Sequence, residues 1–381
     1  MGNLKDTAWI VCCISLLSCC HGEADPERRR QQQLKQDLLY NYSTTVSPYG
    51  TGNRVNVSLS FAPIAVVAVE EASQIFRLSG SLTMSWKDPW LTWNNTNGVE
   101  SLAFKSEEIW TPNFIIPNAV GNKISSLTAS MPINVRSTGT TLMFIIDEFE
   151  TICNLDVTRY PYDEQECHMS FLGLLDSRLY LRSQGLSDIF SAYFTGSSEW
   201  ELVNTTFHEK HFHAFYDALP YIDVKFRLRR HSIFYTLSVI FPMCLLSFLN
   251  ACVFLLPAAS GEKISFLVSI FVSGAVFLNY INDAIPKSGN ASRLTIYLVL
   301  LLSQSALALL ATLLVINTHH RQGALLCRFS KKVKVTDLDN KPSAWNELSG
   351  IQKDEAANRL DKILFVMFVT MAAASILVFY V

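Results

Sequence analysis

Residues 229–257 read RRHSIFYTLSVIFPMCLLSFLNACVFLLP, and the composition of the chain changes within them. Residues 233–256 carry no charge, and about 20 apolar residues are enough for a helix to cross a bilayer. From about residue 25 to residue 232 no long apolar run occurs, whereas three more follow residue 257. The sequence therefore predicts a domain outside the membrane, residues 25–232, joined to a membrane domain.

Four apolar segments make up the predicted membrane domain. They cover residues 233–256, 264–281, 294–316 and 363–381. Each is long enough to span a hydrocarbon core of about 30 Å at about 1.5 Å per residue. Spans one to three therefore occupy 233–316, and the fourth occupies 363–381. The link 317–362 contains the basic run Lys331-Lys332-Val333-Lys334, and an excess of basic residues predicts a cytoplasmic link.

The segment before the membrane domain predicts a β-sandwich. Apolar and polar residues alternate in 55–61, 76–86 and 222–228, and residues 27–39 predict a short polar helix. Alternation gives a strand one buried and one wet face, as in antiparallel sandwiches. The expected fold class is an α+β multidomain membrane protein, with an extracellular antiparallel β-sandwich followed by a four-helix transmembrane bundle.

Residues 1–24 have the layout of a secretory signal peptide. Lys5 precedes an apolar run from Ala8 to Cys20, and small and polar residues follow. An N-terminal membrane anchor is the alternative, although the run is short for a span. A signal peptide predicts a multi-pass protein of the plasma membrane with both mature termini extracellular.

The nine cysteines sort by predicted compartment. Outside the signal peptide, the spans and the cytoplasmic link, only Cys153 and Cys167 remain. In an oxidising compartment they predict one disulfide, with two free thiols as the alternative. Four sequons of the outer domain are glycosylation candidates, and a fifth, Asn290, lies close to the membrane. The four are Asn41, Asn56, Asn94 and Asn204.

Overall composition excludes several classes of protein. The 381 residues are 49% hydrophobic and 17% charged, with a formal net charge of -2. Disorder is therefore excluded as the dominant state, and a nucleic-acid partner is not indicated. No nucleophile, metal or phosphate-binding motif occurs, so neither an enzyme, a cofactor nor a metal is expected. A carrier is disfavoured because no internal repeat is present.

A polar stripe follows the second span, about residues 264–282. At about 100° per residue, one helix face combines acids, serines, valines and an asparagine. These residues are Glu262, Ser265, Ser269, Val272, Val276, Asn279 and Asp283. Copies around an axis would line a pore with an acidic ring at each mouth and a valine constriction between them. A polar seam buried within a single-chain bundle is the alternative.

Several motifs, in order along the mature chain, resemble those of the Cys-loop receptors, the pentameric ligand-gated ion channel subunits. The signature loop is matched by Cys153–Cys167 with its core Tyr160-Pro161-Tyr162-Asp163. Trp86–Asn94, Ile109–Pro112 and Leu256–Lys263 match two strand motifs and the link into the pore helix. The similarity is greatest to the nicotinic and serotonin-gated cation branch.

This resemblance implies a pentamer of identical or related subunits in the lipid bilayer. A small-molecule agonist would bind between outer domains and open a pore for inorganic cations, with Glu262 associated with cation selectivity. It also implies a gating contact of Tyr160, Pro161 and Asp163 with the link between the second and third spans, around Pro286.

The ligand site departs from amine-gated relatives, which hold an ammonium group in an aromatic box. By the same resemblance, Ser81, Pro117 and Leu174 stand where those relatives have aromatic residues. The ligand-site candidates are Tyr221, Tyr216, Phe215, Leu174 and Pro117. Acetylcholine and serotonin are therefore not the expected agonists.

Two further hypotheses concern this site. An eroded agonist site favours, as the alternative function, a non-gating accessory or binding subunit of a heteropentamer. His211 and His213 share a face if this segment is a strand, and zinc or proton sensing competes there with a solvated hairpin.

Overall fold

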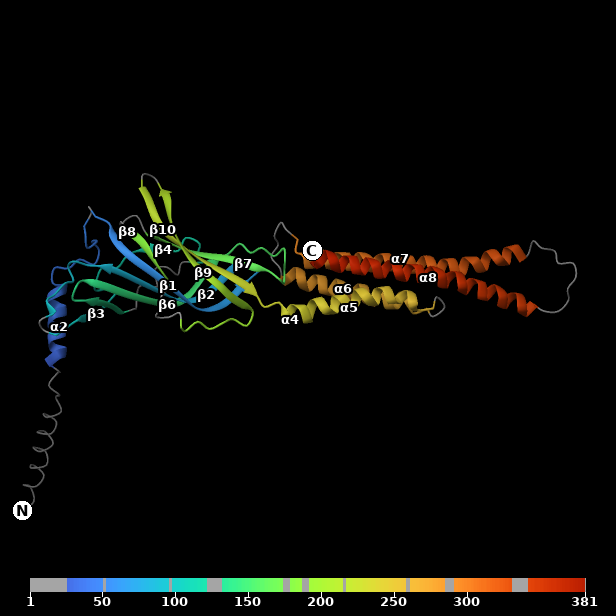
Figure 1. The fold of residues 1–381 in the computed structure, drawn as a ribbon, viewed down its shortest axis with the longest axis horizontal. Helices are drawn as coiled ribbons and strands as arrows, with labels where there is room; N and C mark the ends of the chain where they lie inside the picture. The colour runs from blue at the N-terminus through green and yellow to red at the C-terminus, as the bar shows by residue number, and fades with distance from the viewer. Residues whose placement is uncertain are drawn as a thin grey trace, which may run out of the picture.

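The computed structural model describes residues 26–50, 53–95, 98–121, 132–173, 179–186, 192–214, 217–257, 261–284, 291–330 and 342–380. The predicted signal peptide lies outside them. The molecule is elongated, with a β-domain and a helical bundle lying end to end (Figure 1). The expected fold class is confirmed: two sheets are followed by four apolar helices of membrane-spanning length.

Ten strands of the described residues form two sheets. They are β1 Val55–Glu70, β2 Ile75–Lys87, β3 Ser101–Lys105, β4 Phe114–Ile115, β5 Pro132–Arg136, β6 Thr140–Ile152, β7 Glu164–Gly173, β8 Leu179–Leu186, β9 Trp200–Ala214 and β10 Asp217–Arg230. The larger sheet has the order β3-β5-β6-β2-β1-β8, and the smaller has the order β4-β7-β10-β9.

One strand pair differs from the expected antiparallel arrangement. β1 and β8 are parallel, whereas the other paired strands are antiparallel. The chain leaves β7 in the smaller sheet and enters β8 at the edge of the larger one. Because β7 and β8 belong to different sheets, they do not pair as a hairpin, and the direction of β8 is free to match that of β1.

The core of the β-domain lies between the two sheets. Phe61 of β1 is fully buried, and its ring centroid lies 5.5 Å from that of Phe149, 6.3 Å from that of Phe171 and 5.8 Å from that of Phe226. Burying each such side chain contributes about 1.5–3 kcal/mol. A Cβ atom on Gly80 would lie 2.3 Å from the Phe61 ring, so only glycine allows β2 to approach this closely.

The first membrane-length segment contains an irregular turn. It comprises α4 Ile233–Tyr235, the π-helical η4 Thr236–Ile240, α5 Phe241–Cys252 and the 3₁₀ turn η5 Val253–Leu255. Pro242 is the second residue of α5, and only Phe241 separates it from the π-helical turn. A proline has no N–H to donate and its ring crowds the preceding turn, which a wider π turn accommodates.

The other helices are α2 Pro26–Leu39, α6 Lys263–Ala284, α7 Arg293–Ser330 and α8 Pro342–Tyr380. The helix expected at 27–39 is therefore present. α7 and α8 both run past the predicted ends of their spans, into residues 317–362, and they lie side by side (Figure 1). Proline at the first position of α8 suits a helix start, because that residue needs no intrahelical N–H bond.

Candidate functional site

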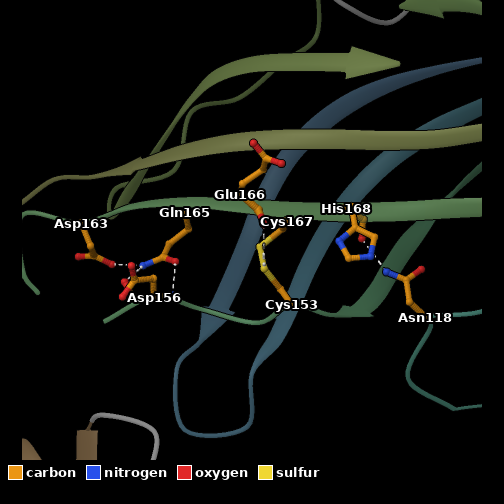
Figure 2. Close-up of a disulfide and its surroundings, with 8 residues drawn as sticks. All are labelled: Asn118, Cys153, Asp156, Asp163, Gln165, Glu166, Cys167 and His168. Carbon is orange, nitrogen blue, oxygen red and sulfur yellow. Dashed lines mark hydrogen bonds between the residues drawn. A yellow bond between two sulfur atoms is a disulfide. The ribbon is translucent and has the colours of Figure 1, made fainter. Parts of the chain in front are cut away.

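The signature loop is closed by the predicted disulfide between Cys153 and Cys167, whose Cα atoms lie 5.2 Å apart (Figure 2). The Gln165 side chain braces the loop from within. Its amide group donates to the Asp156 carbonyl at 2.9 Å and to the Asp163 carboxylate, while its own oxygen accepts from the Asp156 N–H at 2.9 Å. The loop is therefore held by a covalent bond and by a buried amide.

Arg230, the last residue of β10, is the most enclosed charge where the β-domain meets the helices. Its side chain is 0% exposed and binds the carboxylates of Glu71 at 2.6 Å, Asp163 at 2.9 Å and Glu199 at 2.9 Å. Burial lowers the pKa of Arg230, but Asp163 and Glu71 more than offset this effect, so the pKa is raised overall. The guanidinium stays charged at every physiological pH.

Three aromatic rings complete the enclosure. The guanidinium carbon lies 4.1 Å from the ring centroid of Trp200, 4.9 Å from that of Tyr160 and 5.4 Å from that of Tyr235. Aromatic faces attract cations, more strongly where water is absent. We call these three rings, Arg230 and its three carboxylates the Arg230 cluster.

The Arg230 cluster joins segments that are distant in sequence. Glu71 lies in the turn between β1 and β2, Asp163 in the signature loop, Glu199 directly before β9, and Tyr235 in the first membrane-length segment. The Tyr235 hydroxyl also donates to the Glu199 carboxylate. One cation thus connects both sheets of the β-domain to the first helix.

Sequence reasoning did not single out Arg230, which lies in the basic sequence Arg229-Arg230-His231 directly before the first apolar segment. A signal was present. Arg230 has the same parity on its strand as Phe226 and Leu228, and these side chains are buried, whereas Arg229 is exposed. An arginine in phase with an apolar alternation predicts a buried, partnered charge.

The signature loop also contacts the helices. Tyr160 is 4% exposed and belongs to an apolar cluster that includes Leu294 and Tyr297 of α7, and burial raises the pKa of its hydroxyl. The N–H of Arg293, at the start of α7, donates to the Thr158 carbonyl at 3.0 Å.

Two of the predicted coupling residues face Arg230, and one of them also reaches the helices. Tyr160 contacts both Arg230 and α7, whereas Asp163 binds Arg230 within the β-domain. Pro161 lies between these two residues in sequence. It is buried, and its peptide bond to Tyr160 is cis. Pro286 lies outside the described residues.

The polar stripe is exposed along α6 and the residue before it. Each of its seven members is exposed, and Val272 and Val276 are 53% and 64% exposed. The opposite face, with Leu267, Ile270 and Ile281, is buried against the other helices. A polar seam buried within one chain does not describe this arrangement, because the chain leaves the stripe uncovered.

Hydroxyl groups on this helix bond to its own backbone. Ser269 donates to the Ser265 carbonyl and Ser273 donates to the Ser269 carbonyl, each at 2.9 Å. This i to i−4 bonding lets a serine satisfy its proton without a second helix.

A buried ion pair holds the base of α6. Lys263 Nζ lies 2.8 Å from both carboxylate oxygens of Asp361 on α8, and the side chains are 2% and 5% exposed. Sequence reasoning missed this pair. Lys263 lies about 160° from Ser265 on a helical wheel, opposite the stripe, which was the available signal.

Two of the ligand-site candidates are described, and both lie on or beside the smaller sheet, Pro117 after its edge strand β4 and Tyr221 on its inner strand β10. Pro117 is exposed just after β4, whose Ile115 pairs with Leu172 of β7, and Leu172 pairs with Tyr221 of β10. Lys210 Nζ lies 6.0 Å from the ring centroid of Tyr221. Leu174, Phe215 and Tyr216 lie outside the described residues.

Neighbouring positions add to this picture. Lys210 also pairs at 2.7 Å with Asp223, which accepts a bond from the Ser170 hydroxyl at 3.0 Å. Ser81 is 0% exposed on β2, so its side chain is not presented at the surface of this chain. His211 is exposed, and the side chain of His213 lies outside the described part.

The four sequon asparagines of the outer domain are all exposed. They are Asn41, Asn56, Asn94 and Asn204. Each is thus open to modification, whereas Asn290 lies outside the described residues.

A β-domain standing on four membrane-length helices, with a polar helix face uncovered, defines a subunit of a membrane receptor or channel. Sequence models of two domains match the chain: the neurotransmitter-gated ion-channel ligand binding domain over residues 31–232, and the neurotransmitter-gated ion-channel transmembrane region over residues 239–344. The chain belongs to the neurotransmitter-gated ion channels, so it is a receptor subunit and not an enzyme.

Individual relatives agree with this assignment. The chain is 32% identical to neuronal acetylcholine receptor subunit non-alpha-2 of Carassius auratus, over 82% of this chain and 69% of the relative. It is 31% identical to subunit beta-3 of Homo sapiens, with the same two coverages. It is 32% identical to subunit alpha-5 of Bos taurus, over 80% of this chain and 65% of the relative.

Proposed function

We propose that five such subunits, identical or related, surround a cation-selective pore lined by the stripe of α6, in a channel that an agonist opens. The observation that carries this proposal is the exposure of the whole stripe in a chain whose other helices bury the opposite face. Exposed serines, an asparagine and acids on a membrane helix require water or protein beside them. A symmetric ring supplies a water-filled axis.

The stripe accounts for both selectivity and closure. Five copies of Glu262 form a carboxylate ring at one mouth, and five copies of Asp283 form another at the opposite mouth. Such rings concentrate cations and repel anions. Val272 and Val276 between them provide an apolar constriction, which loses its water when narrow.

Coupling to the outer domain runs through two contacts. The Arg230 cluster connects β9 and β10 to Tyr235 of the first span, and Tyr160 connects the signature loop to α7. Movement of the β9–β10 hairpin would therefore displace helices at two points. Pro161 and, by the family resemblance, Pro286 are proposed to take part in the same coupling. A buried cation with several partners transmits such movement as a rigid unit.

The agonist site is proposed between neighbouring outer domains, with Tyr221, Tyr216, Phe215, Leu174 and Pro117 as its candidate residues. The relatives are named acetylcholine receptor subunits. In this chain Pro117 is exposed where, by the resemblance, amine-gated relatives have an aromatic residue, so a different agonist chemistry is proposed. The same observation favours the second candidate, an accessory or binding subunit that does not gate alone.

The remaining assignments complete the topology. Residues 1–24 are proposed as a signal peptide, 25–232 as the extracellular domain, 233–316 and 363–381 as the spans, and 317–362 as the cytoplasmic link. Both mature termini are extracellular in this arrangement. The protein is a multi-pass glycoprotein of the plasma membrane.

The test uses a Val272→Thr background, in which the added hydroxyl wets the constriction and gives current without a known agonist. Dilution of external sodium chloride should shift the reversal potential to more negative values, because the current of a cation channel follows the sodium gradient. Glu262→Ala on this background should weaken cation preference, whereas Glu262→Asp should retain it. A reversal potential that follows chloride would contradict the proposed selectivity.

Homomeric expression separates the two candidate functions. Cells that express only this chain are challenged with acetylcholine, serotonin, protons and zinc. Evoked current in homomers would exclude the accessory subunit. Val272→Thr current that requires co-expression of a relative such as subunit beta-3 would favour it.

A further inference from the structure

Two opposite charges are consecutive at the end of α6 that lies away from the β-domain. Glu262, directly before the helix, is exposed and belongs to the polar stripe, whereas Lys263, the first residue of the helix, is buried. The Glu262 carbonyl accepts the N–H of Phe266 at 3.0 Å, so Glu262 is bound to the first turn. Glu262 and Lys263 are therefore fixed at one helix end, with their Cα atoms about 3.8 Å apart.

The lysine is paired by a residue of another helix. Lys263 Nζ lies 2.8 Å from each carboxylate oxygen of Asp361 on α8, and the two side chains are 2% and 5% exposed. Among the described residues, no second acid lies within 4.0 Å of this ammonium group. Arg359 and Lys362 lie close to Asp361 in sequence, but both are exposed. The single carboxylate of Asp361 therefore balances the charge of Lys263.

The net charge of the proposed pore mouth depends on this pairing. In each subunit Glu262 and Asp361 contribute one negative charge each and Lys263 contributes one positive charge, which leaves one net negative charge. Without Asp361 the charges of Glu262 and Lys263 would cancel. In the proposed ring of five subunits, the lysines would then offset the whole carboxylate ring at this mouth.

Burial makes an unpaired lysine effective at a distance. Charges that water and salt ions cannot reach are screened much less than exposed charges, and their field crosses a medium of low dielectric constant. The Lys263 side chain lies opposite the stripe, and protein encloses it. An uncompensated Lys263 would therefore act on cations at the mouth although no ion contacts it.

We propose that Asp361 of α8 is a determinant of the cation selectivity of this pore. It neutralises Lys263, so the negative charge of the Glu262 ring keeps its effect at the mouth. This inference rests on the proposed function, since it needs a pore lined by α6. α8 packs against α5 and α7 and contributes no residue to the stripe. A helix outside the pore wall would thus set the charge that a permeating ion meets.

The test records single channels of the full-length protein in the Val272→Thr background. Asp361→Asn should lower the permeability ratio of sodium to chloride about threefold and the unitary sodium conductance about twofold, in the same direction as Glu262→Ala. Adding Lys263→Gln to Asp361→Asn removes the unpaired positive charge and should restore both quantities. Lys362→Gln removes an exposed charge directly after Asp361 in sequence, and this matched control should change neither quantity.

Two further measurements keep the proposal falsifiable. A buried lysine can lose its proton when its partner is removed, whereas arginine stays charged. Lys263→Arg combined with Asp361→Asn should therefore lower the permeability ratio at least as far as Asp361→Asn alone. If rings made only of Asp361→Asn chains do not assemble, co-expression with the parent chain gives rings of mixed composition. Their unitary conductance should fall in steps, one step for each Asp361→Asn chain.

Several results would overturn the proposal. One is an unchanged permeability ratio both in Asp361→Asn and in its combination with Lys263→Arg. Another is a reduced ratio that the added Lys263→Gln change does not restore, and a third is a single conductance for all mixed rings.

The same recordings judge the proposed pore separately. A cation-selective parent channel that is weakened by Glu262→Ala but not by Asp361→Asn would refute the role of Asp361 and leave the proposed pore intact. A parent channel whose reversal potential follows chloride would refute both.

Discussion

Two buried cations lie at opposite ends of the helical bundle, and their surroundings differ. Arg230, at the β-domain end, has three carboxylates and three aromatic rings from several segments. Lys263, at the other end of α6, has the single carboxylate of Asp361. The first site, the Arg230 cluster, has more carboxylates than one cation needs. The second site is an ion pair between two helices.

The difference concerns what each site tolerates. Removing one partner of an isolated buried ion pair leaves an uncompensated charge, which costs about 3–5 kcal/mol. In the Arg230 cluster the loss of one carboxylate leaves others in place, whereas the loss of the arginine strands several carboxylates together. The Arg230 cluster should therefore tolerate the loss of one carboxylate better than the loss of Arg230.

The largest expected effect is that of Arg230→Met. This change leaves the buried Asp163 and the partly buried Glu71 without a counter-charge, and we expect a loss of about 5 kcal/mol in the free energy of unfolding or a failure to assemble. The measurement is the thermal unfolding midpoint of the detergent-solubilised protein, followed by size-exclusion chromatography. Arg229→Met is the matched control, because that side chain is 53% exposed and should cost less than about 1 kcal/mol. Equal effects of the two changes on the unfolding midpoint would contradict the claim that Arg230 holds this region together.

The second prediction concerns the ion pair of Lys263 with Asp361 at the opposite end of the bundle. Lys263→Met leaves the Asp361 carboxylate buried alone and should cost about 3 kcal/mol. Adding Asp361→Leu should restore most of this stability, since an apolar pair can replace a buried ion pair. A double-mutant cycle of unfolding midpoints measures the coupling. Additive losses in the double variant would show that the two side chains do not depend on each other.

A third prediction sharpens the contrast within the Arg230 cluster. The Glu199 side chain is 41% exposed, and its loss leaves Asp163 and Glu71 on the guanidinium. Glu199→Gln should therefore cost about 1 kcal/mol or less, a fraction of the effect of Arg230→Met. Similar unfolding midpoints for Glu199→Gln and Arg230→Met would refute the claim that Arg230 keeps enough carboxylate partners when Glu199 is lost.

The smallest expected effect is the pH dependence of the ion pair between the buried Asp223 and the exposed Lys210. Burial raises the pKa of Asp223, but Lys210 and Ser170 outweigh it, so the pKa is lowered. The stabilisation is complete above pH about 4, the ordinary value, and is lost as pH falls through the lower folded-state pKa. Asp223→Asn should abolish this acid-dependent part, below about 1 kcal/mol because Lys210 is 44% exposed. Parallel acid-unfolding curves for the two proteins would contradict it.

Much of the architecture could be predicted from the sequence because it depends on local patterns. Residues 233–256 predict a span by length and lack of charge alone, and alternation near Phe61 predicts a strand with one buried face. The parallel pairing of β1 with β8 could not be predicted in this way. It depends on where the chain enters the second sheet, and no local pattern encodes that choice.

In the candidate site, too, one part could be predicted from local patterns and another part could not. The stripe of α6 follows from helix periodicity, so its exposed face was predictable from Ser265 to Asp283. The partners of Arg230 were not, because Glu71 and Glu199 are more than 30 residues away and only the packing of strands brings them together. Periodicity shows that Arg230 and Lys263 point inward, but it does not show which acids meet them.

The bonded hydroxyls of α6 have a further consequence for the proposed pore. Ser269 of the stripe directs its proton to the Ser265 carbonyl one turn earlier, so its oxygen lone pairs are the part that remains available. A passing cation would meet oxygen atoms that can replace its hydration water, whereas an anion would find no proton offered to it. The neutral middle of the pore would thus discriminate by the orientation of dipoles, and that discrimination would persist where salt screens the carboxylate rings.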